Sequence, residues 1–160
     1  MANAPEIHER AELTQVRVLD APRDVVFRAW TAPAQMAAWW GPKGFSAPVC
    51  EMDARPGGRI FILMRGPDGE DHPMAGRFEE VAPPDRLVFT GWPEDGQGNR
   101  YAENHVTVTF EDEPGGKTRM TVVSHAVAFV PMGGALGKEM DRGWNESYLR
   151  LDALLMKDKR

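Results

Sequence analysis

The hydrophobic pattern begins with an alternating segment and then changes period twice. Apolar and polar residues alternate over residues 13–19, where β-branched side chains are frequent, and this predicts a β-strand. Residues 1–12 are polar and show no period, so we expect a flexible arm there. A helical period follows over Pro22–Thr31 and again over Pro33–Ala38, which predicts two short amphipathic helices.

The middle of the chain, residues 47–126, has a β pattern throughout. Turn signals built from proline, glycine and aspartate recur along it, and no helical period interrupts them. This is typical of an antiparallel meander and not of alternating strands and helices. The predicted strands are Val49–Asp53, Arg59–Arg65, Met74–Val81, Leu87–Trp92, Asn104–Glu111 and Arg119–Ala126.

After Pro131 the period becomes helical again, and it predicts one long amphipathic helix from about Leu136 to Met156. The pattern therefore predicts an α+β fold, in which a bent antiparallel sheet of about seven strands surrounds the long C-terminal helix and two short helices follow the first strand. We find no linker and no repeat, and we expect residues 13–157 to form a single domain.

Strand parity predicts which side chains face the long helix. On Arg59–Arg65 the arginine-bounded set should face outward, leaving Ile60, Ile62 and Met64 inside. Aromatic and methionine side chains dominate this inner set, so it forms either a pocket for an apolar molecule or a filled core. The candidate ligand-binding residues are Trp40, Phe45, Ile60, Ile62, Met64, Met74, Phe78, Phe89, Trp92, Val106, Val108, Met120, Val122, Ser124, Met140, Trp144, Tyr148 and Leu151.

The segment Trp39–Phe45 combines three large aromatic residues with two glycines and a proline. Glycine and proline disfavour regular structure, so we expect a loop. Adjacent residues of an extended segment point in different directions, so one tryptophan should point inward and the other should lie at a rim. Gly41 and Gly44 would let the loop move, and it could then gate access to a pocket.

Few residues suggest catalytic or metal chemistry. The four histidines have no H-x-H or H-x-x-x-H spacing, so we predict no metal site and no cofactor. Ser124 and His125 are neighbours on a strand and point to opposite faces, so they cannot act as a pair. Cys50 has no basic neighbour to lower its pKa, and we interpret it as structural. We therefore assign no catalytic residue.

Three acidic residues leave an alternative open. Glu79, Glu103 and Glu146 could enter the cavity, where a buried carboxylate with a raised pKa can act as a general base. The other interpretation is that they are solvated or paired with Arg77 or Arg100.

Composition narrows the partners. The 160 residues carry a net charge of −5, with no basic face of the kind that binds nucleic acid. No apolar run approaches the roughly 20 residues that span a bilayer, so we expect no membrane contact. The N-terminus lacks the pattern of a secretory signal, and a cytoplasmic location follows as an expectation.

Several motifs in this order resemble one known family. They are Asp20-Ala21-Pro22-Arg23-Asp24-Val25-Val26-Phe27, Trp39-Trp40-Gly41-Pro42, Pro56-Gly57-Gly58, Arg65-Gly66-Pro67-Asp68-Gly69, Pro83-Pro84-Asp85-Arg86-Leu87-Val88-Phe89-Thr90 and Gly143-Trp144-Asn145-Glu146. Together they resemble the bacterial branch of the heat-shock-ninety ATPase activator homologues, within the START-like (SRPBCC, birch-pollen-allergen-like) superfamily, over about residues 13–156. The resemblance implies a helix-grip fold with an internal cavity. It does not imply one activity, because the superfamily includes lipid carriers, hormone receptors, and polyketide cyclases and aromatases.

Three functions follow as hypotheses. The first is a small protein that binds a hydrophobic or aromatic molecule in its cavity, which the resemblance favours over a filled core. The second is an enzyme of cyclase, dehydratase or hydrolase type acting on such a molecule. The third is a chaperone-associated or regulatory interaction protein. Phe61 and Leu63 lie on the outward parity of their strand, so either a homodimer or the N-terminal arm is expected to cover them.

Overall fold

The alternating segments of the chain pair into one sheet. A computed structural model describes residues 6–95 and 97–157. The sheet has seven strands in the order β1-β7-β6-β5-β4-β3-β2, and every neighbouring pair is antiparallel, as predicted. The strands are β1 (Glu9–Leu19), β2 (Ser46–Met52), β3 (Arg59–Arg65), β4 (Asp71–Ala82), β5 (Arg86–Pro93), β6 (Ala102–Glu113) and β7 (Lys117–Ala128).

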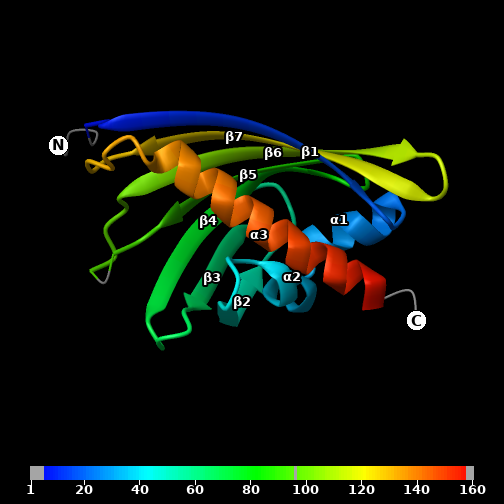
Figure 1. The fold of residues 1–160 in the computed structure, drawn as a ribbon, viewed down its shortest axis with the longest axis horizontal. Helices are drawn as coiled ribbons and strands as arrows, with labels where there is room; N and C mark the ends of the chain where they lie inside the picture. The colour runs from blue at the N-terminus through cyan, green and yellow to red at the C-terminus, as the bar shows by residue number, and fades with distance from the viewer. Residues whose placement is uncertain (1–5, 96, 158–160) are drawn as a thin grey trace.

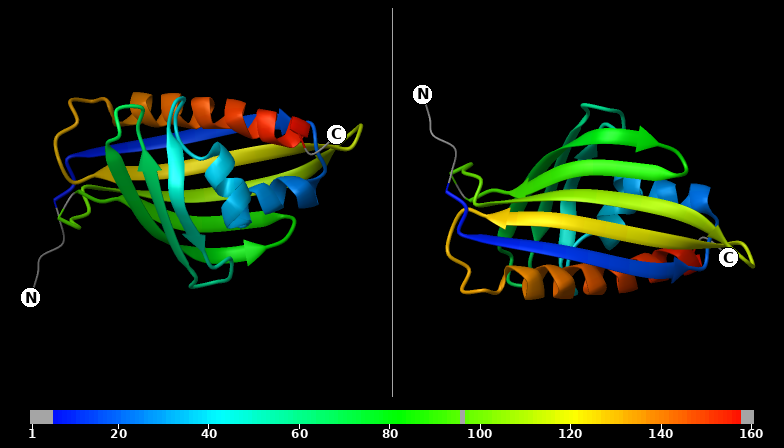
Figure 2. Two further views of the ribbon diagram at one scale, coloured as in Figure 1. Left: turned by 90° about the horizontal axis from the view of Figure 1, so that it is seen from below. Right: turned by 90° about the horizontal axis from the view of Figure 1, so that it is seen from above.

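The helices lie on the concave face of this sheet. The long helix α3 (Leu136–Lys157) crosses it diagonally, and the short helices α1 (Arg23–Thr31) and α2 (Pro33–Trp39) close one end (Figure 1). Figure 2 shows the sheet bending around the helices, with β2 and β3 turned strongly away from the direction of β1 and β7. The predicted helix-grip arrangement is confirmed. None of the helices in the described ranges is both long enough and apolar enough to span a membrane.

Helix α3 is fixed to the sheet along one apolar stripe and by polar contacts near its ends. At its start, the Glu9 carboxylate of β1 accepts hydrogen bonds from the backbone N–H groups of Gly134 and Leu136, each at 2.7 Å. The Leu136 N–H is one of the donors that a helix N-terminus leaves without an intrahelical partner, and the Gly134 N–H lies just before the helix. Nearer its end, Arg17 of β1 forms an ion pair with Asp152. The buried stripe comprises Leu136, Trp144, Ser147, Tyr148, Leu151 and Leu155.

Strand β1 is longer than the sequence pattern predicted. It begins at Glu9 and not at Leu13, because residues 9–12 continue the antiparallel ladder with β7, from Ala128 to His125. The expected arm is therefore shorter. Residues 6–8 are its described part, and the His8 N–H donates a hydrogen bond to the Ala128 carbonyl oxygen at 2.9 Å. Residues 1–5 lie outside the described ranges.

The predicted strand parity is confirmed on the sheet. Ile60 and Ile62 of β3, Val106 and Val108 of β6, and their partners on β7 are buried, while the alternating residues lie on the outer face. Part of the core lies at the end closed by α1 and α2. There the fully buried Trp30 and Trp39 pack edge to face, with ring centres 4.8 Å apart.

The outward pair Phe61 and Leu63 is half-buried, and the Arg59 guanidinium lies 5.7 Å from the centre of the Phe61 ring. The described part of the N-terminal arm runs beside β7, four strands away from β3 in the sheet, so it does not cover this pair. The alternative in which the arm covers them gains no support from residues 6–8.

Candidate ligand-binding cavity

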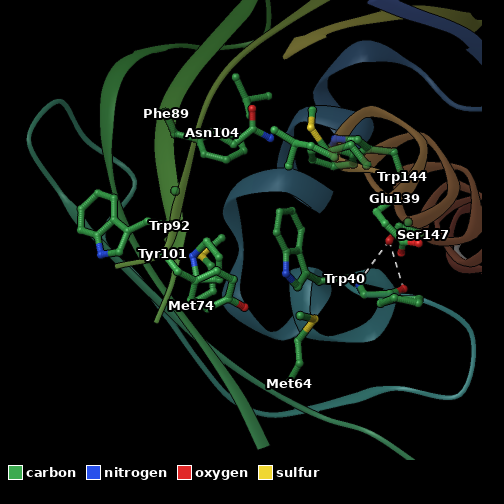
Figure 3. Close-up of a pocket in the computed structure, with 18 residues that line it drawn as sticks. Trp40, Met64, Met74, Phe89, Trp92, Tyr101, Asn104, Glu139, Trp144 and Ser147 are labelled. Carbon is green, nitrogen blue, oxygen red and sulfur yellow. Dashed lines mark hydrogen bonds between the residues drawn. The ribbon is translucent and has the colours of Figure 1, made fainter. Parts of the chain in front are cut away.

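A cavity of about 450 Å³ lies between α3, the loop after α2, and the inner face of strands β3 to β6 (Figure 3). Its position follows from the fold. Residues of the first half of α3 line it on one side, and residues of β3 to β6 line it on the other. The lining residues are Trp40, Gly41, Pro42, Met64, Met74, Phe89, Gly91, Trp92, Pro93, Tyr101, Asn104, Val106, Leu136, Glu139, Met140, Gly143, Trp144 and Ser147.

Aromatic rings form one wall of the cavity. Trp40 meets Trp144 edge to face, with ring centres 5.4 Å apart and planes at 88°. Trp144 in turn stacks on Tyr148 at 5.6 Å and lies 5.8 Å from the buried Trp30. The wall is therefore continuous with the core and is held in a fixed orientation. Rings placed in this way offer both a face and an edge to an aromatic ligand.

Three methionines also contribute to the cavity wall. Met64 of β3, Met74 of β4 and Met140 of α3 each line the cavity. A methionine side chain has three rotatable bonds and a polarizable sulfur, so such a wall can adapt to ligands of different shape. Gly41 is required beside Met64, because it has a φ of +105° and an added Cβ would approach the Met64 sulfur to 2.9 Å.

The Trp39–Phe45 loop places its two tryptophans as predicted, and hydrogen bonds from α3 contact its backbone. Trp39 is fully buried, and its indole N–H donates to the Ala29 carbonyl at 2.8 Å, whereas Trp40 is half-buried and lines the cavity. Arg150 of α3 donates to the backbone carbonyl oxygens of residues 38, 40, 41 and 42, at 3.0 to 3.3 Å. Ser147 both donates to and accepts from the backbone of Gly41.

Arg150 does not occupy a fully exposed position on α3. The residue is half-buried, forms no ion pair with an acid in the described part of the chain, and points to the loop carbonyls. Desolvation by burial lowers the pKa of its guanidinium, which nevertheless stays protonated at neutral pH. Its charge is therefore directed to four backbone oxygens and fixes the loop to α3.

Polar groups in the cavity are few. Ser147 is already hydrogen-bonded to the loop, and Glu139, at the exposed edge, accepts a hydrogen bond from Arg142 at 2.7 Å. Burial raises the pKa of the half-buried Tyr101, so its hydroxyl stays neutral at physiological pH. Asn104 projects into the cavity between Phe89 and Trp144 (Figure 3).

Eight of the eighteen predicted residues line this cavity: Trp40, Met64, Met74, Phe89, Trp92, Val106, Met140 and Trp144. The other ten lie elsewhere. Phe45 packs beside His72 at the turn between β3 and β4, with ring centres 5.7 Å apart. The remaining nine are core residues, and three of them border a small second void against α1 and α2. The nine are Ile60, Ile62, Phe78, Val108, Met120, Val122, Ser124, Tyr148 and Leu151.

The lining residues that sequence reasoning missed fall into two groups. Gly41, Pro42, Gly91, Pro93 and Gly143 contribute backbone and space, and strand parity carries no signal for them. Tyr101, Asn104, Leu136, Glu139 and Ser147 have side chains in the wall. Parity on β6 already pointed to Asn104, which shares a face with Val106, and the helical stripe pointed to Ser147.

The acidic residues considered as general bases do not line the cavity. Glu79 lies on the outer face, where its Oε2 is 2.8 Å from the His105 Nε2. Glu103 is 3.4 Å from Arg100, and Glu146 accepts a hydrogen bond from the Lys43 N–H. The cyclase-like alternative therefore gains no support from these three carboxylates.

The other reactive side chains are also distant from the cavity. Burial raises the pKa of the Cys50 thiol to about 11, so it is protonated and unreactive at neutral pH. His72 and His105 do not meet, because they lie on β4 and β6, with β5 between them. Over residues 6–95 and 97–157 no three His, Cys, Asp or Glu side chains group as a metal site would need.

Comparison with known proteins agrees with this geometry. The family model described as "Activator of Hsp90 ATPase homolog 1-like protein" matches residues 20–156. The chain belongs to this family. No functionally curated protein matches it significantly.

Solved bacterial structures of this family share the whole fold. An uncharacterized protein from Rhizobium leguminosarum is 28% identical, with a TM-score of 0.80 over 93% of this chain and 96% of that one. A protein from Chromobacterium violaceum is 28% identical, with a TM-score of 0.78 over 89% and 95%. The AHSA1 protein from Silicibacter pomeroyi is 26% identical, with a TM-score of 0.77 over 92% and 99%. The family and fold expected from the sequence motifs are thus confirmed.

Proposed function

We propose that this member of the activator-homologue family binds a hydrophobic, ring-containing small molecule in the cavity beneath α3. The observation that carries the proposal is the cavity itself, about 450 Å³ of space walled by tryptophan, phenylalanine and methionine. That volume lies within the range of small-molecule sites, roughly 300–1,000 Å³. Proteins of this helix-grip fold commonly bind hydrophobic ligands, which supports the same conclusion.

The proposal is tested with N-phenyl-1-naphthylamine, a neutral apolar probe whose fluorescence increases when it leaves water. We expect saturable binding of one probe per chain. Trp40→Ala should change probe affinity and cost less stability than Trp144→Ala, because Trp40 is half-buried whereas Trp144 is 8% exposed and packs against three rings. Truncating a buried tryptophan costs about 3–5 kcal/mol.

The comparison of the two variants separates a binding site from a core. Equal destabilisation by Trp40→Ala and Trp144→Ala, with probe affinity unchanged in both, would show that the two rings only fill space. Absence of saturable binding to the unmodified protein would also contradict the proposal.

A further inference from the structure

The amide of Asn104 offers an unpaired hydrogen-bond donor to the cavity. Its side chain lies on the inner face of β6 and projects between Phe89 and Trp144 (Figure 3). The Oδ1 is buried, whereas the Nδ2 is accessible and forms no hydrogen bond to a residue of the described ranges. The cross-strand neighbours, Gly91 on β5 and Ala126 on β7, have no side chain that accepts a hydrogen bond from it.

The site favours this orientation of the amide. Reversing it would place both N–H groups at the buried position of Oδ1, where neither Gly91 nor Ala126 has a side chain to accept them. Buried N–H groups without a partner are rarer in native proteins than carbonyl oxygens without one. Asn104 therefore keeps its oxygen in the wall and directs its two N–H groups to the cavity.

The other unpaired polar side chains of the wall are also donors. The indole N–H groups of Trp40 and Trp144 form no hydrogen bond within residues 6–95 and 97–157, and an indole nitrogen can only donate. The hydroxyl of Tyr101 is likewise unpaired in that part of the chain, and burial keeps it neutral by raising its pKa. It can donate as well as accept.

The acceptors of the wall, in contrast, are occupied or lie at its edge. The Ser147 Oγ accepts from the Gly41 N–H at 3.2 Å, and the loop carbonyl oxygens accept from Arg150. Glu139 is exposed and accepts from Arg142 at 2.7 Å. A ligand that brings an acceptor therefore pairs with the free donors of the wall, whereas a ligand that brings only a donor finds no free acceptor inside.

The charges of the lining restrict this acceptor to a neutral one. None of the lining residues is a lysine, arginine or histidine, and the one acidic residue is Glu139 at the edge. A carboxylate or phosphate would lose its hydration and gain no cation in return, which strongly opposes its burial. A carbonyl oxygen accepts hydrogen bonds without carrying a charge, so its desolvation costs much less.

We infer that the cavity selects a neutral ring compound that carries a carbonyl oxygen, and that the Nδ2 of Asn104 donates a hydrogen bond to this oxygen. The inference rests on the proposed function and specifies its ligand class. The rings of the compound lie against Trp40, Trp144 and Phe89, and its carbonyl points to β6 (Figure 3).

Two isosteric naphthalenes test this. 2-Acetylnaphthalene carries the carbonyl, and 2-isopropenylnaphthalene has a CH₂ group in place of the oxygen, so their shapes are nearly the same. Affinities are measured at pH 7 by displacement of N-phenyl-1-naphthylamine from the unmodified protein and from Asn104→Leu. The intrinsic difference in hydrophobicity between the two compounds cancels when their affinity ratio is compared between the two proteins.

The variant should lower the ratio of ketone affinity to alkene affinity about three- to tenfold, the effect of one neutral hydrogen bond. Asn145→Leu is the matched control, since it makes the same chemical change at an exposed position of α3. It should leave the ratio unchanged.

A ¹³C label at the ketone carbonyl separates a hydrogen bond from a change in polarity. A carbonyl carbon whose oxygen accepts a hydrogen bond resonates downfield of its position in an apolar solvent. Bound to the unmodified protein, the labelled carbon should lie downfield of its position in cyclohexane. In Asn104→Leu it should move back toward that position.

The outcomes separate the two levels of the proposal. A ratio that changes by less than about twofold in Asn104→Leu overturns the carbonyl inference, as does a bound carbonyl signal at the cyclohexane position in the unmodified protein. Tighter binding of 2-naphthoate than of 2-acetylnaphthalene overturns it as well, because the wall would then favour an anion. If N-phenyl-1-naphthylamine binds and 2-acetylnaphthalene does not displace it, the ligand class is wrong and the apolar binding function stands; if the probe itself does not bind, the proposed function is wrong.

Discussion

Replacing Arg150 tests whether the loop over the cavity is fixed or mobile. Its guanidinium donates to four carbonyl oxygens between Ala38 and Pro42, three of them through one nitrogen. Because that nitrogen carries only two hydrogens, the four contacts amount to at most three hydrogen bonds, two from this nitrogen and one from the other. A hydrogen bond to a charged group contributes about 1.5–3 kcal/mol, and partial exposure reduces this. We therefore expect Arg150→Met to lower the free energy of unfolding by about 2–3 kcal/mol.

The assay combines urea unfolding with limited proteolysis by trypsin. Methionine keeps the aliphatic length of arginine, so a stability loss reports on the guanidinium and not on lost packing. In the unmodified protein the exposed Lys43, within the loop, should be cleaved slowly because the backbone around it is held by α3. In Arg150→Met, cleavage after Lys43 should rise more than cleavage after Lys117, the exposed first residue of β7.

Arg142→Met provides the control on the same helix. Arg142 is exposed and forms an ion pair with Glu139, and an exposed ion pair contributes about 0–1 kcal/mol. Its removal should leave both stability and Lys43 cleavage nearly unchanged. If Arg150→Met behaves like Arg142→Met in both assays, the loop does not depend on Arg150 and the gate expected from Gly41 and Gly44 returns.

Two further predictions concern the sheet. The Arg65 Nε donates to the Asp71 carboxylate at 2.8 Å and holds the pKa of that carboxyl below its usual value. The pair therefore stabilises the fold above the ordinary aspartate pKa of about 3.9, and this contribution is lost as the pH falls through the lower pKa of the folded state. The melting temperature of Asp71→Asn should lie below that of the unmodified protein at pH 7, and the two should converge in acid. A difference in melting temperature that stays constant down to about pH 2 would contradict this. Phe61, on the outer face of β3, should lie in a homodimer interface. Sedimentation at micromolar concentration should detect a dimer, and Phe61→Arg should convert it to a monomer. If the unmodified protein is a monomer, this interface does not exist.

The sequence predicted the elements and their faces well because both follow from local periodicity. Every predicted strand and helix is present, and parity put Ile62, Val106 and Val122 on the inner face, where they lie. Parity does not say how far along a strand the core gives way to a cavity. On β6, Val106 lines the cavity, while Val108, two residues on, is core at the end that α1 and α2 close.

The contacts that shape the site are long-range and carry no periodic signal. Arg150 sits where the helical pattern allows an exposed residue, and its partners are backbone carbonyls 108 to 112 positions earlier. Asn104 is polar on an inward position, which parity alone would treat as an exception within the core. Only the arrangement of β5, β6 and β7 reveals that its neighbours, Gly91 and Ala126, leave it without a partner.

The cavity exists because α3 is anchored to the sheet on both sides of it. Glu9 fixes the start of the helix, and beyond the cavity Tyr148 donates to the Gln15 Oε1 at 2.9 Å. Between these points the helix presents Gly143 and Ser147 to the cavity, two of the smallest residues, while the sheet bends away. With α3 and the loop both fixed, the adaptable part of the wall is its methionines. A ligand of variable shape should therefore be accommodated by rotation of Met64, Met74 and Met140, and the backbone around it should keep its position.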